Sequence, residues 1–229
     1  MVTKTAPSRL HQPSLFSQDE STGRVELFPA VWKAVEDLTM PDLKLRRNAL
    51  DRLIELNAPR FSPIVAYVLV TCLTDPDLAF RSQVIKTLGE ILVPDGDGHP
   101  APDEVRKSLT HYLAQMRTRQ VFALLQVTTD HPTLEGHAAR FLDACPHAGN
   151  HLVDILCDNK VSLAVRKQAV QMIGRVGYLE ALPALDRLAA RLETRISGQR
   201  TMPFAPPPGS NESDLLPAVQ ATLAILRAP

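Results

Sequence analysis

The sequence predicts an all-α fold, an α-solenoid of about five helix pairs. Three segments, at 43–49, 78–84 and 163–169, share one pattern: Leu, any residue, an apolar residue, Arg, any residue, a polar residue and a small residue. An apolar residue follows each segment four positions later, at Leu53, Leu88 and Ile173. Alternation of β-branched and polar residues is almost absent, so no strands are predicted. A chain that repeats one helical unit builds an elongated stack, and such stacks usually serve as binding surfaces.

The chain divides into a tail and a repeat domain. Residues 1–23 are polar, contain scattered Pro and Ser without periodicity, and are predicted to be a flexible N-terminal tail. Residues 24–229 are predicted to form the repeat domain. Prolines lie at the edges of its helices, where their fixed backbone angle suits a first turn. The predicted helices cover, in order, residues 25–38 and 41–56, 61–73 and 77–92, 103–116 and 119–129, an extra helix at 132–144, 147–157 and 162–176, and finally 178–196 and 213–227.

Two loops interrupt this order. Residues 93–102 are rich in Pro, Gly and Asp and cannot be helical. Residues 197–213 split the last helix pair, and their three consecutive prolines favour an extended, polyproline-type segment. Loops inserted into repeat arrays tend to lie on the binding face. We therefore expect Met202 and Phe204 in the second loop either to contact a partner or to fold onto the groove.

Residues 75–89 and 165–174 resemble the second helix of a HEAT repeat, and 181–185 resemble the next first helix. The closest variety is the phycobilisome-lyase-type HEAT-like repeat, and the resemblance is strongest over 60–92 and 147–195. It implies a right-handed solenoid in which Asp–Arg pairs join neighbouring repeats. We therefore expect Arg81 to bond near Asp75 or to a carbonyl at a neighbouring turn. The residues that the resemblance makes structural are Arg46, Asp75, Arg81 and Arg166.

This chain departs from the family pattern at two of the three arginines. The Asp that precedes the arginine by six residues occurs only before Arg81. Met40 replaces it before Arg46, and Lys160 replaces it before Arg166. The ladder of ion pairs between repeats is therefore expected to be incomplete.

Composition bounds the class of protein. Of 229 residues, 45% are apolar and 22% are charged, so the chain can bury a core. Lys+Arg and Asp+Glu both number 25, and we expect no attraction to nucleic acid or membrane from net charge. Three cysteines form no disulfide framework. No apolar run approaches the ~20 residues of a membrane helix, so we expect a soluble, cytoplasmic protein.

One group of side chains with ligand-capable types surrounds a predicted helix start: Cys145, His147, His151 and Cys157. The two histidines are four residues apart and share a helix face. The second cysteine, however, lies about 9 Å farther along the helix at ~1.5 Å per residue, and no Cys-x-x-Cys pair accompanies it. We predict a helix start with buried cysteines and no metal.

The loop at 93–102 suggests a cation site through four residues: Asp95, Asp97, His99 and Asp103. An EF-hand loop beginning at Asp95 would need Gly at its sixth position and Glu at its twelfth. The sequence has Pro100 and Arg106 at those positions. We predict a solvated loop, and no metal or other cofactor in the chain.

Three further features are candidates for partner binding. A basic ridge of residues at four-residue spacing comprises Arg187, Arg191 and Arg195. The last helix has more apolar residues than one packing stripe needs, including Leu223 and Leu226. We predict that this edge stacks on a second copy or on a partner subunit; the alternative is that residues 197–213 fold back over it as a cap. Phe28 and Trp32 form either an aromatic platform or, as we expect, part of the core of the first repeat.

The function predicted from these features is that of a non-catalytic scaffold or adaptor, whose concave face, lined by second helices, grips another protein. No Gly-rich phosphate loop, Gly-x-Ser-x-Gly or His-Glu-x-x-His motif occurs. One alternative is a chromophore lyase or lyase subunit, which the repeat type allows. A nucleic-acid-binding repeat protein is a third interpretation, which a steep salt dependence of binding would reveal.

Overall fold

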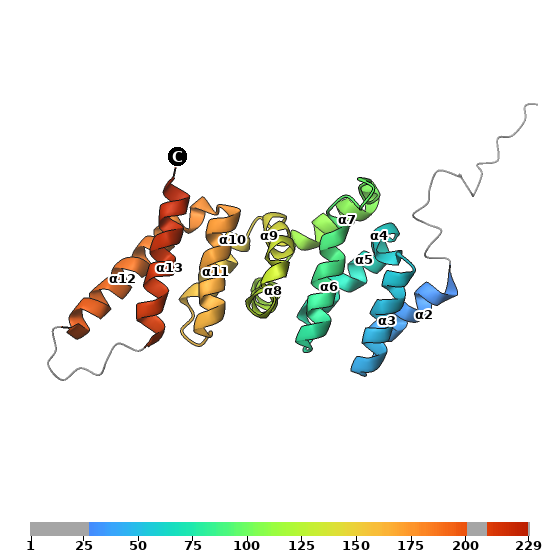
Figure 1. The fold of residues 1–229 in the computed structure, drawn as a ribbon, viewed down its shortest axis with the longest axis horizontal. Coiled ribbons are helices and arrows are strands. Elements are labelled where there is room, and N and C mark those ends of the chain that lie inside the picture. Colours follow the sequence, from blue (N-terminus) through green and yellow to red (C-terminus); the bar gives the residue numbers. More distant parts are fainter. Residues whose placement is uncertain (1–27, 201–209, 229) are drawn as a thin grey trace, which may run out of the picture.

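The computed structural model describes residues 28–200 and 210–228, and regular structure in this part of the chain is entirely helical. Its twelve α-helices form an elongated array that runs from the N-terminal helices at one end to the C-terminal helices at the other, with α13 placed between α11 and α12 (Figure 1). The predicted all-α class is therefore confirmed. No described helix is both long enough and apolar enough to cross a bilayer.

The first unit consists of α2 (Pro29–Leu38) and α3 (Leu43–Glu55), which pack against each other. Pro29 occupies the first turn of α2, as its fixed φ angle favours. Asp42 caps α3 because its side chain accepts a hydrogen bond from the Lys44 N–H at 2.8 Å. The turn between these helices therefore follows from the local sequence.

The second unit contains a short helix that the sequence did not predict, α4 (Ala58–Phe61), before α5 (Pro63–Thr71). Asn57 takes a left-handed conformation, with φ of 53°, between α3 and α4, and asparagine adopts this conformation more readily than most residues. A 3-10 turn, η1 (Cys72–Thr74), leads to α6 (Leu78–Ile91). Asp77 caps α6 by accepting from the Phe80 N–H at 2.7 Å, so Pro76 precedes the helix and does not begin it.

The third unit has three helices and corrects the predicted pairing of 103–116 with 119–129. These are α7 (Asp103–Leu113), α8 (Thr118–Asp130) and α9 (Glu135–Asp143), the last preceded by η2 (Pro132–Leu134). Instead of forming a hairpin with α8, α7 packs on α5; α8 packs on α10 and α11, and α9 on α6. The Tyr67 and Tyr112 rings contact each other at a tilt of 40°, with centroids 4.5 Å apart, and join α5 to α7. Buried residues on several faces of α8 require neighbours on more than one side.

The C-terminal units contain α10 (Ala148–Cys157) and α11 (Leu163–Val176), then η3 (Leu179–Ala181), α12 (Leu182–Arg200) and α13 (Ser210–Arg227). Gly177 ends α11 with φ of 87°, a conformation that glycine adopts without strain. Gly174 allows α13 to approach α11 closely, because an added Cβ would lie 3.2 Å from Thr222 Cγ2. The last helix thus lies against both α11 and α12.

The predicted core residues of the repeated pattern are all buried, which confirms the helical register derived from sequence. They are Leu50, Leu53, Val84, Leu88, Ala169, Val170 and Ile173. They belong to one continuous hydrophobic cluster that extends through every described unit. A continuous core of this kind fixes the relative positions of the turns and surfaces described next.

Candidate functional site

Arg46 and Arg166, two of the repeated arginines, bond at turns. Arg46 donates to the Met40 and Pro41 carbonyls at 3.0 and 2.7 Å, and its Nε lies 2.9 Å from an Asp75 carboxylate oxygen. Arg166 donates from Nε to the Leu156 carbonyl, at the end of α10, at 2.8 Å. These side chains join neighbouring helices, and Arg46, held by Asp75 and two carbonyls, also lines an open depression beside the turn before α6.

Arg81 differs from the prediction. Its guanidinium donates to the Ala123 carbonyl at 3.4 Å and to Gln126 Oε1 at 3.0 Å, both in α8. Asp75 is instead paired with Arg46, so the expected bond from Arg81 to Asp75 or to a neighbouring turn is wrong. Burial lowers the pKa of Arg81, while the charges of Asp75 and Asp77 oppose that shift. Arg81 bonds to α8 because the structure packs α8 against α6. From sequence, residues 119–129 were instead predicted to pair with 103–116.

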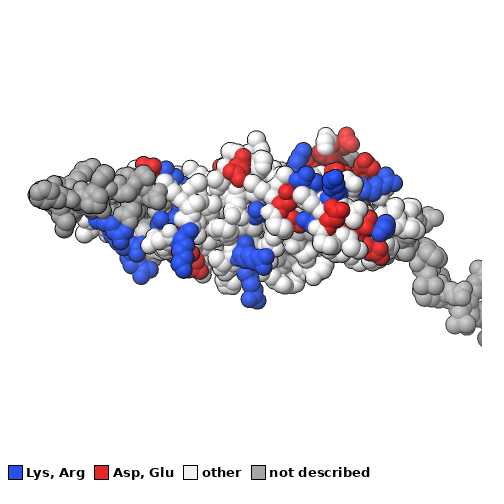
Figure 2. Space-filling model, turned by 90° about the horizontal axis from the view of Figure 1, so that it is seen from below, with Lys and Arg blue, Asp and Glu red and all other residues white. Residues whose placement is uncertain are grey.

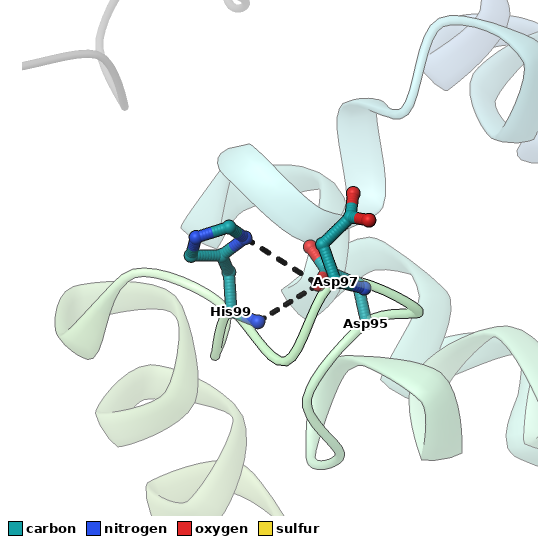
Figure 3. Close-up of side chains that lie close together, drawn as sticks. All are labelled: Asp95, Asp97 and His99. Atoms are coloured by element: carbon teal, nitrogen blue, oxygen red, sulfur yellow. Dashed lines mark hydrogen bonds and ion pairs between the residues drawn. The ribbon is translucent and has the colours of Figure 1, made fainter.

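Asp95, Asp97 and His99 converge in the loop before α7, as Figure 3 shows. Asp95 accepts from the backbone N–H groups of His99 at 2.8 Å and Asp97 at 3.1 Å, and Arg60 lies 3.5 Å from it. The first of these backbone bonds contributes most to holding the pKa of Asp95 below its ordinary value. All three side chains are exposed. Because the Asp95 carboxylate is already engaged, the cluster is explained as a loop-stabilising cap.

The group of two cysteines and two histidines is dispersed. The Cys145 thiol is buried and donates to the Met116 carbonyl at 3.7 Å. His151 Nδ1 is hydrogen-bonded to the Thr118 hydroxyl at 2.9 Å. Cys157 is exposed at the other end of α10. The described structure therefore does not bring these side chains together as one set of metal ligands.

The predicted partner-binding residues of α12 are Arg187, Arg191 and Arg195, and all three are exposed. Arg187 donates to the Pro183 carbonyl at 3.1 Å. Figure 2 shows that acidic and basic side chains are mixed over the N-terminal half of the face seen from below, whereas basic ones predominate over the C-terminal half. Met202 and Phe204 lie outside the described residues.

The expected open apolar edge at the C-terminus is wrong for Leu223 and Leu226, which are both buried. The reason is that α13 packs on two helices, α11 and α12, and so uses more than one apolar stripe. Of the large apolar residues in this helix, Ile225 remains exposed. Self-association through this edge stays a prediction, and the alternative cap at 197–213 lies largely outside the described residues.

An exposed apolar row lies instead on the first helices of the N-terminal units. We define this apolar row by five residues: Phe28 at the N-cap of α2, Trp32 in α2, Ile64 and Tyr67 in α5, and Tyr112 in α7. The first four are exposed, and Tyr112 is partly buried. Trp32 and Ile64 line the same shallow depression, and the Tyr67 ring contacts the Tyr112 ring at a tilt of 40°. The expected burial of Phe28 and Trp32 in the first repeat's core is wrong, since both are exposed.

The sequence contained one signal for this surface. Helix α5 has no charged residue, although Ile64 and Tyr67 on it are exposed. In the sequence analysis, this apolar run serves only as evidence against a membrane-spanning helix and not as evidence for an exposed apolar surface. A helix with one face in the core and no charge on the other indicates a second apolar contact.

A pocket with a volume of about 540 Å³ lies on another part of the molecule. It is lined by residues from the end of α3, α4, the end of α6, the loop after α6, and α9. Its walls combine apolar side chains with Arg60, Glu90, His137 and Arg140. The sequence did not predict it because its walls are far apart along the chain.

No model of a known protein family matches the chain, and no curated protein matches it in sequence.

Proposed function

We propose that this protein is a non-catalytic scaffold or adaptor that binds another protein through a right-handed, HEAT-like α-solenoid. The elongated array of helices supports this architecture. So does the ion pair between Arg46 and Asp75, because the resemblance implies Asp–Arg pairs between neighbouring repeats. Each unit buries its apolar face against its neighbours, and the array presents long outer surfaces to partners.

The apolar row is the single observation that supports protein binding most strongly. Trp32, Ile64 and Tyr67 are 48%, 42% and 43% exposed on two helices that meet at one depression. Exposed apolar side chains that are contiguous mark interaction surfaces far more often than scattered ones do. Trp and Tyr also dominate the binding energy of protein interfaces. We therefore place the principal contact on the first helices and not on the face formed by second helices.

The partner's matching surface is expected to be apolar and uncharged at its centre. Helix α5 offers no charge for an ion pair, and a buried unpaired charge from the partner would weaken binding. Charges at the edge of the row, such as the exposed pair of Lys33 with Asp37 at 2.8 Å, would contact the rim. Hydrophobic burial, and not ionic attraction, is thus the proposed source of affinity.

The test is quantitative capture of partners from native lysate by two double variants. Trp32→Ala with Ile64→Ala removes the apolar side chains that flank the depression. Leu179→Ala with Ile225→Ala is the matched control, because it removes equally exposed apolar side chains elsewhere. We expect the first variant to lose one reproducible partner by about thirtyfold or more, as for hot-spot truncations of 2 kcal/mol. Equal recovery of every protein by both variants would overturn the proposal.

A further inference from the structure

The pocket described above is held open by a preformed rim. Arg60 in α4 donates to the carbonyls of Glu90 at 3.2 Å and Val93 at 3.5 Å, and it also bonds to the His99 carbonyl. Its guanidinium lies 3.5 Å from Asp95, and the side chain is only 12% exposed. One buried cation thus fixes the loop after α6 against α4. Ligand pockets are usually preformed in this way, because ordering a loop on binding would reduce affinity.

One wall of the pocket is apolar. Ile54 at the end of α3 is exposed, although it lines a concave surface. Pro59 and Ile91, which are largely buried, also line the pocket, as do Val93 and Pro94 in the loop. A volume of about 540 Å³ is within the range of small-ligand sites. This wall can therefore cover one large apolar side chain.

The opposite wall carries a cation with no carboxylate partner among the described residues. Arg140 in α9 is exposed, and its Nη1 donates to His137 Nδ1 at 3.4 Å. The His137 ring in turn packs against Gly89, since a Cβ added there would lie 2.1 Å from Nδ1. Burial makes the largest contribution to lowering the pKa of His137, and the positive charge of Arg140 lowers it further. A neutral ring that accepts this hydrogen bond orients the guanidinium.

The remaining charged group of the lining is Glu90, near the end of α6. The Asp95 carboxylate is neutralised by Arg60 and by two backbone N–H groups, so it does not compete for a ligand. Glu90 and Arg140 do not pair with each other in the described structure, although both lie close enough to His137 to affect its pKa, which Glu90 raises and Arg140 lowers. The pocket thus offers one acceptor for an N–H group and one cation for a carboxylate, beside an apolar wall.

We infer that this pocket binds the C-terminal residue of a partner chain, with its apolar side chain against Ile54, its carboxylate at Arg140 and its backbone N–H at Glu90. A terminal residue carries these three groups on one carbon atom. An arginine is suited to a carboxylate because its planar fork can donate two parallel hydrogen bonds. The inference rests on the proposed function, since it requires that the partner is a protein.

Two other ligands share part of this chemistry. A free apolar amino acid would present an ammonium group to Glu90, and would bind more tightly than its N-acetylated form. An internal apolar residue of a peptide has no terminal carboxylate, and would bind as well in the amide form as in the acid form. Three small probes therefore separate these cases: N-acetyl-phenylalanine, N-acetyl-phenylalanine amide and free phenylalanine.

The experiment is titration of the ¹⁵N-labelled full chain with each probe, followed by the backbone amide signals of Gly89 and Gly96. N-acetyl-phenylalanine should bind about tenfold more tightly than its amide, the effect typical of a hydrogen bond to a charged group. Arg140→Gln should abolish this preference, while the control Arg119→Gln, at an exposed arginine of α8 outside the pocket, should retain it. Equal affinity for acid and amide, shifts confined to other residues, or tighter binding of free phenylalanine would each overturn the inference.

The same titration on Trp32→Ala with Ile64→Ala separates this inference from the proposed function. Because the apolar row is formed by α2, α5 and α7, the double variant should bind N-acetyl-phenylalanine as the native chain does. If the pocket fails to bind but capture through the row persists, the pocket inference alone is overturned. If capture through the row fails while the probe binds, the error lies in the proposed function.

Discussion

Arg46 in α3 pairs with Asp75, 29 residues later, in the turn that precedes α6. The two side chains are only 11% and 9% exposed. The Arg46 guanidinium also lies over the Phe80 ring, 5.8 Å from its centroid. Asp75 in turn accepts from the Asp77 N–H at 2.8 Å and so fixes the turn itself. The pair therefore connects the first unit to the start of α6 in the second.

Replacing Asp75 with alanine would leave the Arg46 guanidinium buried without its carboxylate. We expect the free energy of unfolding to fall by about 3 kcal/mol, the loss typical when one partner of a buried ion pair is removed. Denaturant unfolding measures it. Asp186→Ala is the control, because its pair with Arg227 is exposed and should contribute less than about 1 kcal/mol. Similar losses in both variants would show that the Arg46 pair has no special structural role.

The hydrophobic register predicts a contrast between two isoleucines. Ile173 in α11 is fully buried, whereas Ile225 in α13 is 61% exposed. Ile173→Ala should lower the free energy of unfolding by about 3 kcal/mol, since it removes buried methyl groups and leaves a cavity. Ile225→Ala should change it by less than about 0.5 kcal/mol. Thermal melts of the two variants that coincide would contradict the observed register.

Gly89 is predicted to be required for the contact between α6 and α9. A Cβ at this position would lie 2.1 Å from His137 Nδ1 and 2.8 Å from its Cβ, so the whole side chain would have to move. Gly89→Ala should therefore destabilise the protein, although alanine favours helices over glycine. Adding His137→Ala should restore part of the loss, a coupling measured by a double-mutant cycle. Additive effects would rule out the predicted clash.

Acidification is predicted to destabilise the protein partly through His137. Its pKa is lowered in the folded state from an ordinary value of 6.5, first by burial and then by the charges of Arg140 and Lys86, which outweigh the opposing effect of Glu90. Between the two pKa values the unfolded chain binds more protons than the folded chain, so the free energy of unfolding falls as pH falls through 6.5.

This contribution is absent from a variant without the imidazole. His137→Gln should lose less stability than the native chain between about pH 7.5 and about pH 5.5, as measured by urea unfolding at each pH. His131→Gln, which removes an exposed histidine at the end of α8, is the control. If both variants followed the native pH dependence, His137 would not be one of the titrating groups.

The sequence predicted the helices well because each is defined by local chemistry. Prolines, capping residues such as Asp42, and apolar spacing fix the start and buried face of a helix without reference to distant residues. The packing of the third unit could not be predicted in this way. Which neighbours α8 contacts depends on buried residues on several of its faces, and Arg81 changed its partner as a consequence.

The surfaces were harder to predict than the core. Leu223 and Leu226 were predicted to be exposed for partner binding because packing on one neighbour needs only one apolar stripe. They are buried because α13 packs on two neighbours. Trp32 was predicted to be buried because aromatic side chains are highly buried on average, yet it is exposed in the first unit. The pocket is formed by side chains from α4, α6 and α9, which only the folded chain brings together.

Site-specific photo-crosslinking tests the central claim, binding of another protein through the apolar row, most directly. A benzoyl-phenylalanine in place of Tyr67 keeps an aromatic ring within the row, and the same residue in place of Arg119, in α8, provides an exposed control position. On irradiation in cells, position 67 should yield a discrete adduct with another protein that position 119 does not. No adduct beyond that of the control, or an adduct only with a second copy of this 25.2 kDa chain, would contradict the claim.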